Sequence, residues 1–362
     1  MVSDRLYRSL PLRKESLFVK RIIDLLYQRE DRLTVPIYDC DREMDFACMG
    51  HTCIARDFGF SAYVVGGVER IHAVNFSTPS QARQYPWSDV SHTAMDQELE
   101  MFTAWRSRFP HLLGGGCFGP LTVASDILGM ENCTRLAIRQ PEILYTVLDH
   151  VTDYMITLAQ AEQDLGAEAF WVAEPLASLF APRLFMSLSG RYIKRIFESV
   201  DVPGFLHVCG KTTRHTPAMV QTGAQVLSID WMTDLPACLA TVPEEIVIMG
   251  NVDPMLFWQE DEAVLRAAVS KVLEQTRDYK NFILSSGCQI PGQSLPERVE
   301  LFFRMAREFP LWSNEEYRQI RRLSHQAAGL DDGAFAALCL EEGVPEEIAQ
   351  AALRMARARK IT

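Results

Sequence analysis

Short apolar runs alternate with longer amphipathic segments over most of the chain. The short runs are rich in β-branched and aromatic residues and end at polar residues or glycine, which is typical of buried strands. They cover residues 34–38, 60–65, 112–117, 169–173, 204–208, 226–229, 246–249 and 282–284. Segments with apolar residues at helical spacing lie between them, for example 141–165, 183–200 and 261–277. Eight strands alternating with helices predict an α/β fold of the TIM-type (β/α)8 barrel class.

Helical patterns flank the predicted barrel at both ends. Residues 15–29 read as an amphipathic helix, so we predict a first domain at 1–313, a barrel with an N-terminal helical extension. After Pro310, Glu, Arg and Ala recur at helical periods, with breaks at Gly329 and Gly343. This predicts a C-terminal helical appendage at 314–362. It could be a partner surface or the contact of a homo-oligomer, or it could simply cap the barrel.

Polar side chains stand at the ends of most predicted strands. In (β/α)8 barrels the active site lies at the carboxyl ends of the strands, so we expect these side chains to meet at one mouth. They are Glu174, His207, Cys209, Asp230, Asn251, Asp253 and Cys288. The candidate catalytic residues among them are Glu174, Asp230, Asn251 and Asp253.

The remaining three side chains have the chemistry of a metal site. On a strand, His207 and Cys209 are two residues apart and project from the same face. With Cys288 they supply one imidazole and two thiolates, which fits tetrahedral zinc with one position left open. Sulfur ligands favour zinc over magnesium or calcium. The alternative is that these cysteines merely pack in the core, as most buried cysteines do.

Composition narrows the classes of function. The net charge is −11 and the pI about 5.3, which argues against nucleic-acid binding. Residues 1–14 are charged and lack the apolar core of a signal peptide, and no apolar run approaches the length of a membrane span. Nine cysteines in scattered positions fit a reducing compartment. We therefore expect a soluble, cytoplasmic protein that does not bind membranes.

A glycine-rich stretch at 112–120 ends in Phe118, Gly119 and Pro120. It lacks the GK[ST] ending of a phosphate-binding P-loop, and no GxGxxG continues it into a helix. Glycine here indicates close approach of the backbone, either to a ligand or to a neighbouring element.

Several motifs in chain order resemble the uroporphyrinogen decarboxylase superfamily over roughly residues 30–310. They are Gly-Pro-Leu-Thr-Val-Ala-Ser at 119–125, Pro-Glu at 141–142, Gly-Ala-Glu-Ala at 166–169, His-Val-Cys-Gly at 207–210, Gly-Asn-Val-Asp-Pro at 250–254 and Gly-Cys at 287–288. The resemblance implies a distorted (β/α)8 barrel.

Within this superfamily, the H-x-C motif with a distant cysteine resembles the zinc-dependent methylcobamide:coenzyme M methyltransferases. In that branch, zinc held by such residues activates a thiol for attack on a methyl–cobalt bond. The resemblance implies Zn2+ held by His207, Cys209 and Cys288, with Glu174 as a fourth ligand or a hydrogen-bond partner of the ligands.

The same resemblance implies a methylated corrinoid as co-substrate, carried by a small corrinoid-binding protein, and a small-molecule methyl acceptor or donor. A flat macrocycle has to approach the barrel mouth, so that face should be open and partly apolar. Gly119, Phe118, Met255 and Trp258 are candidates to line it, and ordinary core packing is the alternative for the last three.

Other members of the superfamily leave further functions open. The decarboxylases carry an arginine-rich R-Q-A-G-R-Y segment, whereas residues 35–42 here read VPIYDCDR and would repel a polyanion. One alternative is a demethylating enzyme that loads a corrinoid protein from a methoxy or methylamine substrate. The other is a decarboxylase-like barrel that binds a tetrapyrrole without zinc. A metal assay separates it from the methyltransferase and from the demethylating enzyme, because both of these require zinc.

Overall fold

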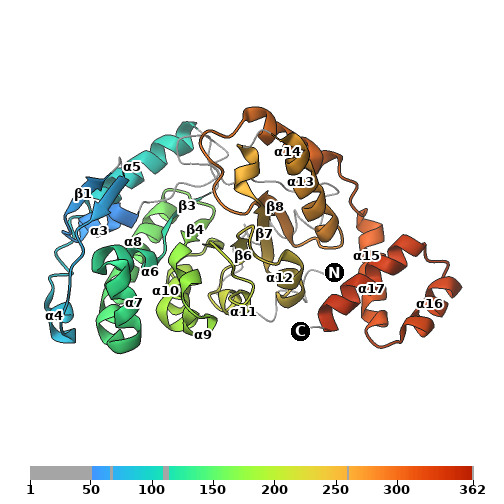
Figure 1. Ribbon diagram of the computed structural model, residues 1–362, viewed down its shortest axis with the longest axis horizontal. Coiled ribbons are helices and arrows are strands. Elements are labelled where there is room, and N and C mark those ends of the chain that lie inside the picture. Colours follow the sequence, from blue (N-terminus) through green and yellow to red (C-terminus); the bar gives the residue numbers. More distant parts are fainter. Residues whose placement is uncertain (1–50, 66–67, 109–113, 259–260, 361–362) are drawn as a thin grey trace. The chain divides into compact units, whose positions relative to one another are not determined.

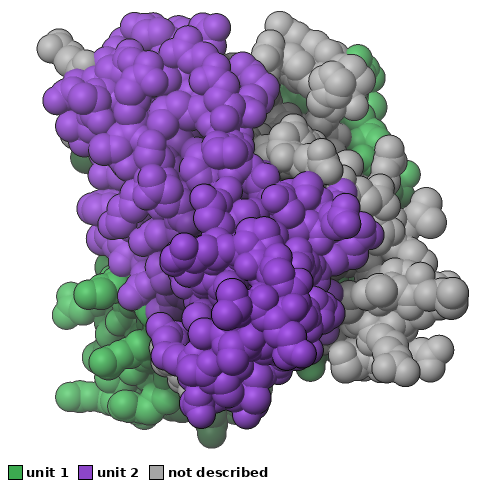
Figure 2. Space-filling model, turned by 90° about the vertical axis from the view of Figure 1, so that its right-hand side faces the viewer, with its two compact units in different colours: residues 1–20, 38–228 green, residues 21–37, 229–362 purple. Residues whose placement is uncertain are grey.

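The computed structural model describes residues 51–65, 68–108, 114–258 and 261–360 (Figure 1). The chain divides into two compact units, one of residues 1–20 and 38–228 and one of residues 21–37 and 229–362 (Figure 2). The division falls inside strand β6 (Val226–Ile229). The strand predicted at 34–38 and the helix predicted at 15–29 lie outside the described residues.

The first unit contains three complete parallel strands that pair in order: β3 (Gly115–Phe118), β4 (Phe170–Ala173) and β5 (Gly204–Val208). Phe118, Ala173 and His207 are aligned across them at the carboxyl edge. The strands are almost entirely buried, which explains why they read as continuous apolar runs.

Helices make up most of the rest of the first unit. The longest, α8 (Pro141–Asp164), begins with proline at its first turn and packs against α6 (Pro120–Leu128) and α10 (Arg191–Glu198). The other elements are α3 (His51–Asp57), α4 (Pro79–Gln84), α5 (Thr93–Arg108), α7 (Met130–Arg139), the 3-10 turn η1 (Pro175–Leu179), α9 (Pro182–Phe185), the π turn η2 (Met186–Gly190) and α11 (Thr216–Val220).

One predicted barrel strand has a different place in the structure. The run 60–65 does contain a strand, β1 (Ala62–Val65), but it pairs antiparallel with β2 (Val68–Ile71) in a two-stranded sheet. Its side chains are largely exposed, Val64 by 68%. The expectation that this run contributes to the parallel sheet is therefore wrong, because strands of that sheet are buried on both faces.

The second unit contains the parallel strands β7 (Val247–Val252) and β8 (Phe282–Ser286). Its other elements up to residue 308 are α12 (Leu235–Thr241), the 3-10 turn η3 (Pro254–Phe257), α13 (Glu262–Thr276) and α14 (Pro296–Glu308). Strands β3 to β8 follow one another in chain order in one six-stranded sheet. An α/β fold is thus confirmed for the described residues.

Where the breaks at Gly329 and Gly343 predict two or three helices, the structure has three: α15 (Asn314–Ala327), α16 (Asp332–Glu341) and α17 (Glu346–Lys360). They share a small core that includes Trp312, Ile320 and Phe335. Asp278, just before β8, accepts hydrogen bonds from Trp312 Nε1 at 2.8 Å and Arg354 Nε at 2.8 Å. The three helices are thereby tied to the strands of their own unit.

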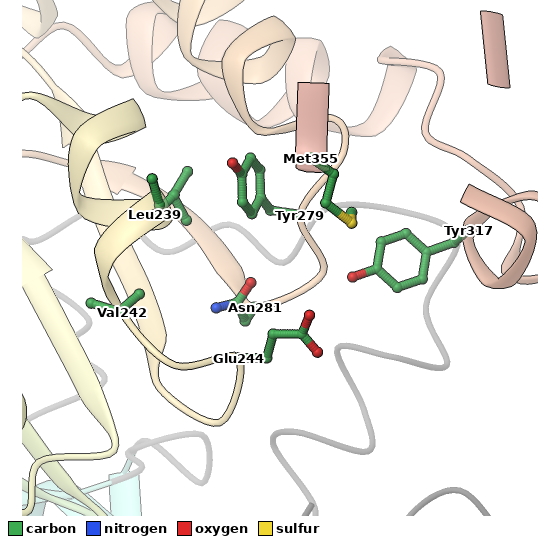
Figure 3. Close-up of a pocket in the computed structure, with 8 residues that line it drawn as sticks. Leu239, Val242, Glu244, Tyr279, Asn281, Tyr317 and Met355 are labelled. Carbon is green, nitrogen blue, oxygen red and sulfur yellow. The ribbon is translucent and has the colours of Figure 1, made fainter. Parts of the chain in front are cut away.

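A small cavity of about 50 Å³ lies where these helices meet the rest of the second unit (Figure 3). Its lining includes Glu244, Tyr279, Asn281, Tyr317 and Met355. Glu244 precedes β7, and Tyr279 and Asn281 precede β8, so the cavity lies at the amino edge of these strands. Every helix among the described residues is too short or too polar to cross a bilayer.

Candidate metal centre

The end of β5 presents an imidazole and a thiol to each other. His207 is buried, and its Nε2 lies 3.1 Å from Sγ of the half-buried Cys209. Its other ring nitrogen, Nδ1, lies 3.0 Å from Oγ of Ser228 in β6. The ring of Trp171 in β4 stacks on the imidazole with 5.9 Å between centroids. The ring of His207 is thus fixed in orientation, with Nε2 on the side of the thiol.

These contacts fit a zinc ligand pair. Metal-binding histidines use one nitrogen for the metal and donate a hydrogen bond from the other, a role that Ser228 can serve for Nδ1–H. In tetrahedral zinc, a bound nitrogen and a bound sulfur lie about 3.6 Å apart. Nε2 and Sγ would therefore have to separate by about half an ångström, which rotation of the Cys209 side chain can supply.

Glu174 follows β4, but its carboxylate is occupied by protein hydrogen bonds. It accepts the backbone N–H groups of Leu121 and Thr122, both at 2.9 Å, and the hydroxyls of Thr122 and Ser189. Leu121 and Thr122 lie in the first turn of α6, so the carboxylate caps that helix. The predicted role as a metal ligand stays a prediction, and these contacts favour a structural role.

The environment of Glu174 also raises its pKa. Burial raises the pKa of Glu174 to about 7, although hydrogen bonds from Thr122, Leu121 and Ser189 act in the opposite direction. A Cβ atom at Gly119 would lie 2.4 Å from Glu174 Oε2. Gly119, predicted to approach a cofactor, is therefore required by a neighbouring side chain; its cofactor role is untested.

The other predicted catalytic residues lie in the second unit and shape its loops. Asp230 accepts a hydrogen bond from the backbone of Met232 at 2.9 Å, and Asp253 accepts one from Met255 at 2.9 Å. Asn251 Nδ2 donates to the carbonyls of Asp230 and Thr233. These side chains hold the loops after β6 and β7, and their catalytic role is untested.

Cys288 follows β8 and is half-buried. The preceding Gly287 donates its backbone N–H to Val252 O at 2.6 Å, at the end of β7. A Cβ at Gly287 would lie 2.2 Å from Trp231 N, so only glycine fits there. The loops after β6, β7 and β8 therefore converge around Cys288 in the second unit.

Large apolar side chains on these same loops face solvent. Trp231, Met232, Met255 and Trp258 are each between 40% and 51% exposed. The alternative that Met255 and Trp258 are buried in the core is therefore wrong. Phe118, at the end of β3 in the first unit, is half-buried.

Sequence reasoning missed the residues that orient the predicted ligands. Ser228 is a buried serine within the apolar run Val-Leu-Ser-Ile, and a polar residue in such a strand is a usable signal. Trp171 reads from sequence only as a core residue. The contacts of Ser189 and Thr122 could not be predicted from the sequence, because their partner Glu174 is distant in the chain.

Comparison with known proteins identifies the family. Residues 38–309 match the family described as Uroporphyrinogen decarboxylase (URO-D). The chain belongs to this family. Among its relatives are a uroporphyrinogen decarboxylase of Synechococcus sp. (strain CC9605), 29% identical over 51% of this chain and 55% of its own length, and the methylcobamide:CoM methyltransferase MtbA of Methanosarcina mazei, 31% identical over 51% and 56%. The chain thus spans about half the length of these relatives.

A solved structure titled "methyltransferase from Methanosarcina mazei" shares the fold of this URO-D family chain. Its TM-score is 0.60 at 20% identity, covering 71% of this chain and 77% of its own. At that identity the likeness concerns the fold alone. The resemblance first drawn from sequence motifs is confirmed for the family, and methyltransferases are among the relatives.

Proposed function

We propose that this protein is a zinc-dependent methyltransferase that moves a methyl group between a protein-bound methylated corrinoid and a thiol. The observation that carries the proposal is the His207–Cys209 pair, with Nε2 and Sγ 3.1 Å apart and Nδ1 held by Ser228. A decarboxylase site needs no such pair. The similarity to methylcobamide:CoM methyltransferases supports the same assignment.

Cys288 is the proposed third ligand. His207, Cys209 and Cys288 together form a candidate set of soft metal ligands. Each cysteine follows a strand of the same sheet, and the carboxyl ends of parallel strands share one edge. We further propose that this sheet belongs to a distorted (β/α)8 barrel over 1–313, with 314–362 as a helical appendage.

The ligand set suits activation of a thiol. Bound zinc would supply the positive charge that keeps a coordinating thiol deprotonated at neutral pH. Two cysteine thiolates and a neutral imidazole cancel the charge of Zn2+, so the site keeps an incoming thiolate electron-rich. Ser228 would hold His207 in the tautomer with Nδ1 protonated, and Trp171 would fix its ring plane.

The exposed apolar residues of the second unit support the corrinoid part of the proposal. Trp231, Met232, Met255 and Trp258 lie on the loops after β6 and β7, and Trp231 adjoins the residue before Cys288. Exposed apolar groups of this size commonly mark binding surfaces. They would cover part of a flat macrocycle as it approaches.

The experiment follows the loss of methylcobalamin absorbance with a panel of thiols, with and without a chelator. We expect zinc-dependent methyl loss with at least one thiol. A thiolate held by zinc stays deprotonated well below its ordinary pKa of about 8.5, so the rate should be nearly flat down to neutral pH. A tenfold fall per pH unit, or no methyl loss in zinc-loaded protein, would contradict the proposal.

A further inference from the structure

Two buried glutamates of the first unit take no part in the proposed reaction. Glu162 of α8 is fully buried, and Glu98 of α5 is nearly so. Among the described residues, neither oxygen of Glu162 has a hydrogen-bond partner at normal distance and angle, and Glu98 Oε1 has none either. An ionised carboxylate in such a position carries a large desolvation cost unless something neutralises it.

The carboxyl group of Glu162 packs against Gly115, the first residue of β3. A Cβ atom at Gly115 would be 1.9 Å from Glu162 Oε2, so the carboxyl group occupies the space that a side chain would take. Gly115 is aligned with Phe170 and Gly204, whereas His207 is aligned with Phe118. The glutamates therefore lie at the amino edge of these strands, about 10 Å along the strand from the candidate metal ligands.

Within the described part of the chain, the charges around Glu162 do not compensate it. Of the elements packed against α8, namely α4, α5, α6, α7, α10 and β3, only α5 brings a charge that acts on it, and this is the like charge of Glu98. The backbone N–H of Gly116 favours the ionised form, but it has less influence than burial and Glu98. Arg106 of α5 lies near Gly166, beyond the end of α8, and makes no hydrogen bond to Glu162.

For two buried carboxyl groups with so few donors among the described residues, the simplest compensation is a proton. A protonated carboxyl group is neutral, so its burial no longer carries the desolvation cost of a charge. We propose that the pair Glu98 and Glu162 retains at least one proton at neutral pH, and that its loss on alkalinisation loosens the packing of α5 on α8 and of α8 on β3. Protonation of the pair would thus make the stability of the first unit depend on pH.

The direction of the titration agrees with the geometry. Burial raises the pKa of Glu98 to about 7, and burial together with Glu98 raises the pKa of Glu162 well above its ordinary value. Because the folded state binds these protons more tightly, their contribution to stability is complete below the ordinary carboxyl pKa. It is lost as the pH rises through the raised values.

The test measures unfolding by urea between pH 5 and pH 8. For Glu98 alone, the unfolding equilibrium constant of the wild type should rise on the order of 50- to 100-fold over this range. Glu162→Gln and Glu98→Gln should each reduce this dependence, because the amide cannot titrate, and the part that Glu174 contributes remains. Glu142→Gln, an exposed position of the same helix, is the matched control and should leave it unchanged.

Infrared spectroscopy gives a second readout that does not depend on stability. The wild type at neutral pH should show the band of a protonated carboxyl group, and Glu162→Gln should weaken it; the part that remains comes from Glu98 and Glu174, whose pKa values are raised to about 7. If Glu162→Gln does not fold, Glu98→Gln carries both measurements. Absence of the band with an unchanged pH dependence in the variants would overturn the proposal. So would a melting temperature raised by Ca2+, Mg2+ or K+ in the wild type and not in Glu162→Gln, because a metal ion would then hold the pair.

Discussion

The ends of β4 and β5 are neighbours in one sheet, yet the polar residues that follow them have different roles. Ala173 and His207 are aligned, so Glu174 and Cys209 emerge from the same edge. Glu174 is fully buried and accepts four hydrogen bonds from α6 and η2. The half-buried Cys209 instead faces the Nε2 of an oriented imidazole. A polar residue at a strand end is therefore a structural residue when helix N–H groups occupy it, and a candidate for chemistry when it faces another metal-binding group.

The largest effect is expected from removing the thiol of Cys209 at the end of β5. Cys209→Ala should lose bound zinc and lower methyl transfer by more than about 100-fold, since a lost ligand costs more than a lost hydrogen-bond partner of a ligand. Metal analysis and the methylcobalamin assay measure this. Cys53→Ala, a half-buried cysteine of the same unit, is the matched control and should keep its zinc. Equal zinc in both variants would remove Cys209 from the site.

Ser228 tests whether the imidazole is oriented as a metal ligand. Removing the hydroxyl with Ser228→Ala leaves Nδ1–H without its partner, so zinc affinity should fall about 10- to 100-fold. Competition with a chromogenic chelator measures the affinity. Ser189→Ala, another fully buried serine of this unit, should leave it unchanged because its partner is Glu174. An unaltered affinity in Ser228→Ala would contradict the assigned tautomer.

A substitution of Glu174 tests whether the polar residue at the end of β4 is structural. In Glu174→Gln, the amide places N–H groups where the carboxylate accepts those of Leu121 and Thr122. The free energy of unfolding should fall by about 1–3 kcal/mol, with zinc affinity almost unchanged. Urea unfolding and chelator competition measure the two quantities. If zinc affinity falls tenfold or more while stability holds, Glu174 belongs to the metal site as the family resemblance implies.

The sequence predicts the buried strands well and the exposed one poorly. The runs 169–173, 204–208, 226–229 and 282–284 are apolar on both faces, and each contains or nearly matches a strand of the sheet. The run 60–65 has the same β-branched and aromatic character, but composition cannot reveal that β1 is exposed and pairs in a hairpin. Which residues lie on the far side of a strand is a tertiary property that its own sequence does not contain.

The candidate site shows the same limit. The spacing of His207 and Cys209 is local, so alternation along one strand predicts that they share a face, and their contact agrees with it. The role of Glu174 depends on Leu121 and Thr122, more than 50 residues earlier in the chain. Its helix-capping role could not be predicted from the residues around it.

The zinc content of the doubly substituted Cys209→Ala/Cys288→Ala protein tests the central claim most directly. Wild-type protein should carry near-stoichiometric zinc, one ion per chain, and the double variant should carry almost none while remaining folded by circular dichroism. A folded double variant that keeps the zinc content of the wild type would contradict the proposed metal centre and the methyl transfer that depends on it.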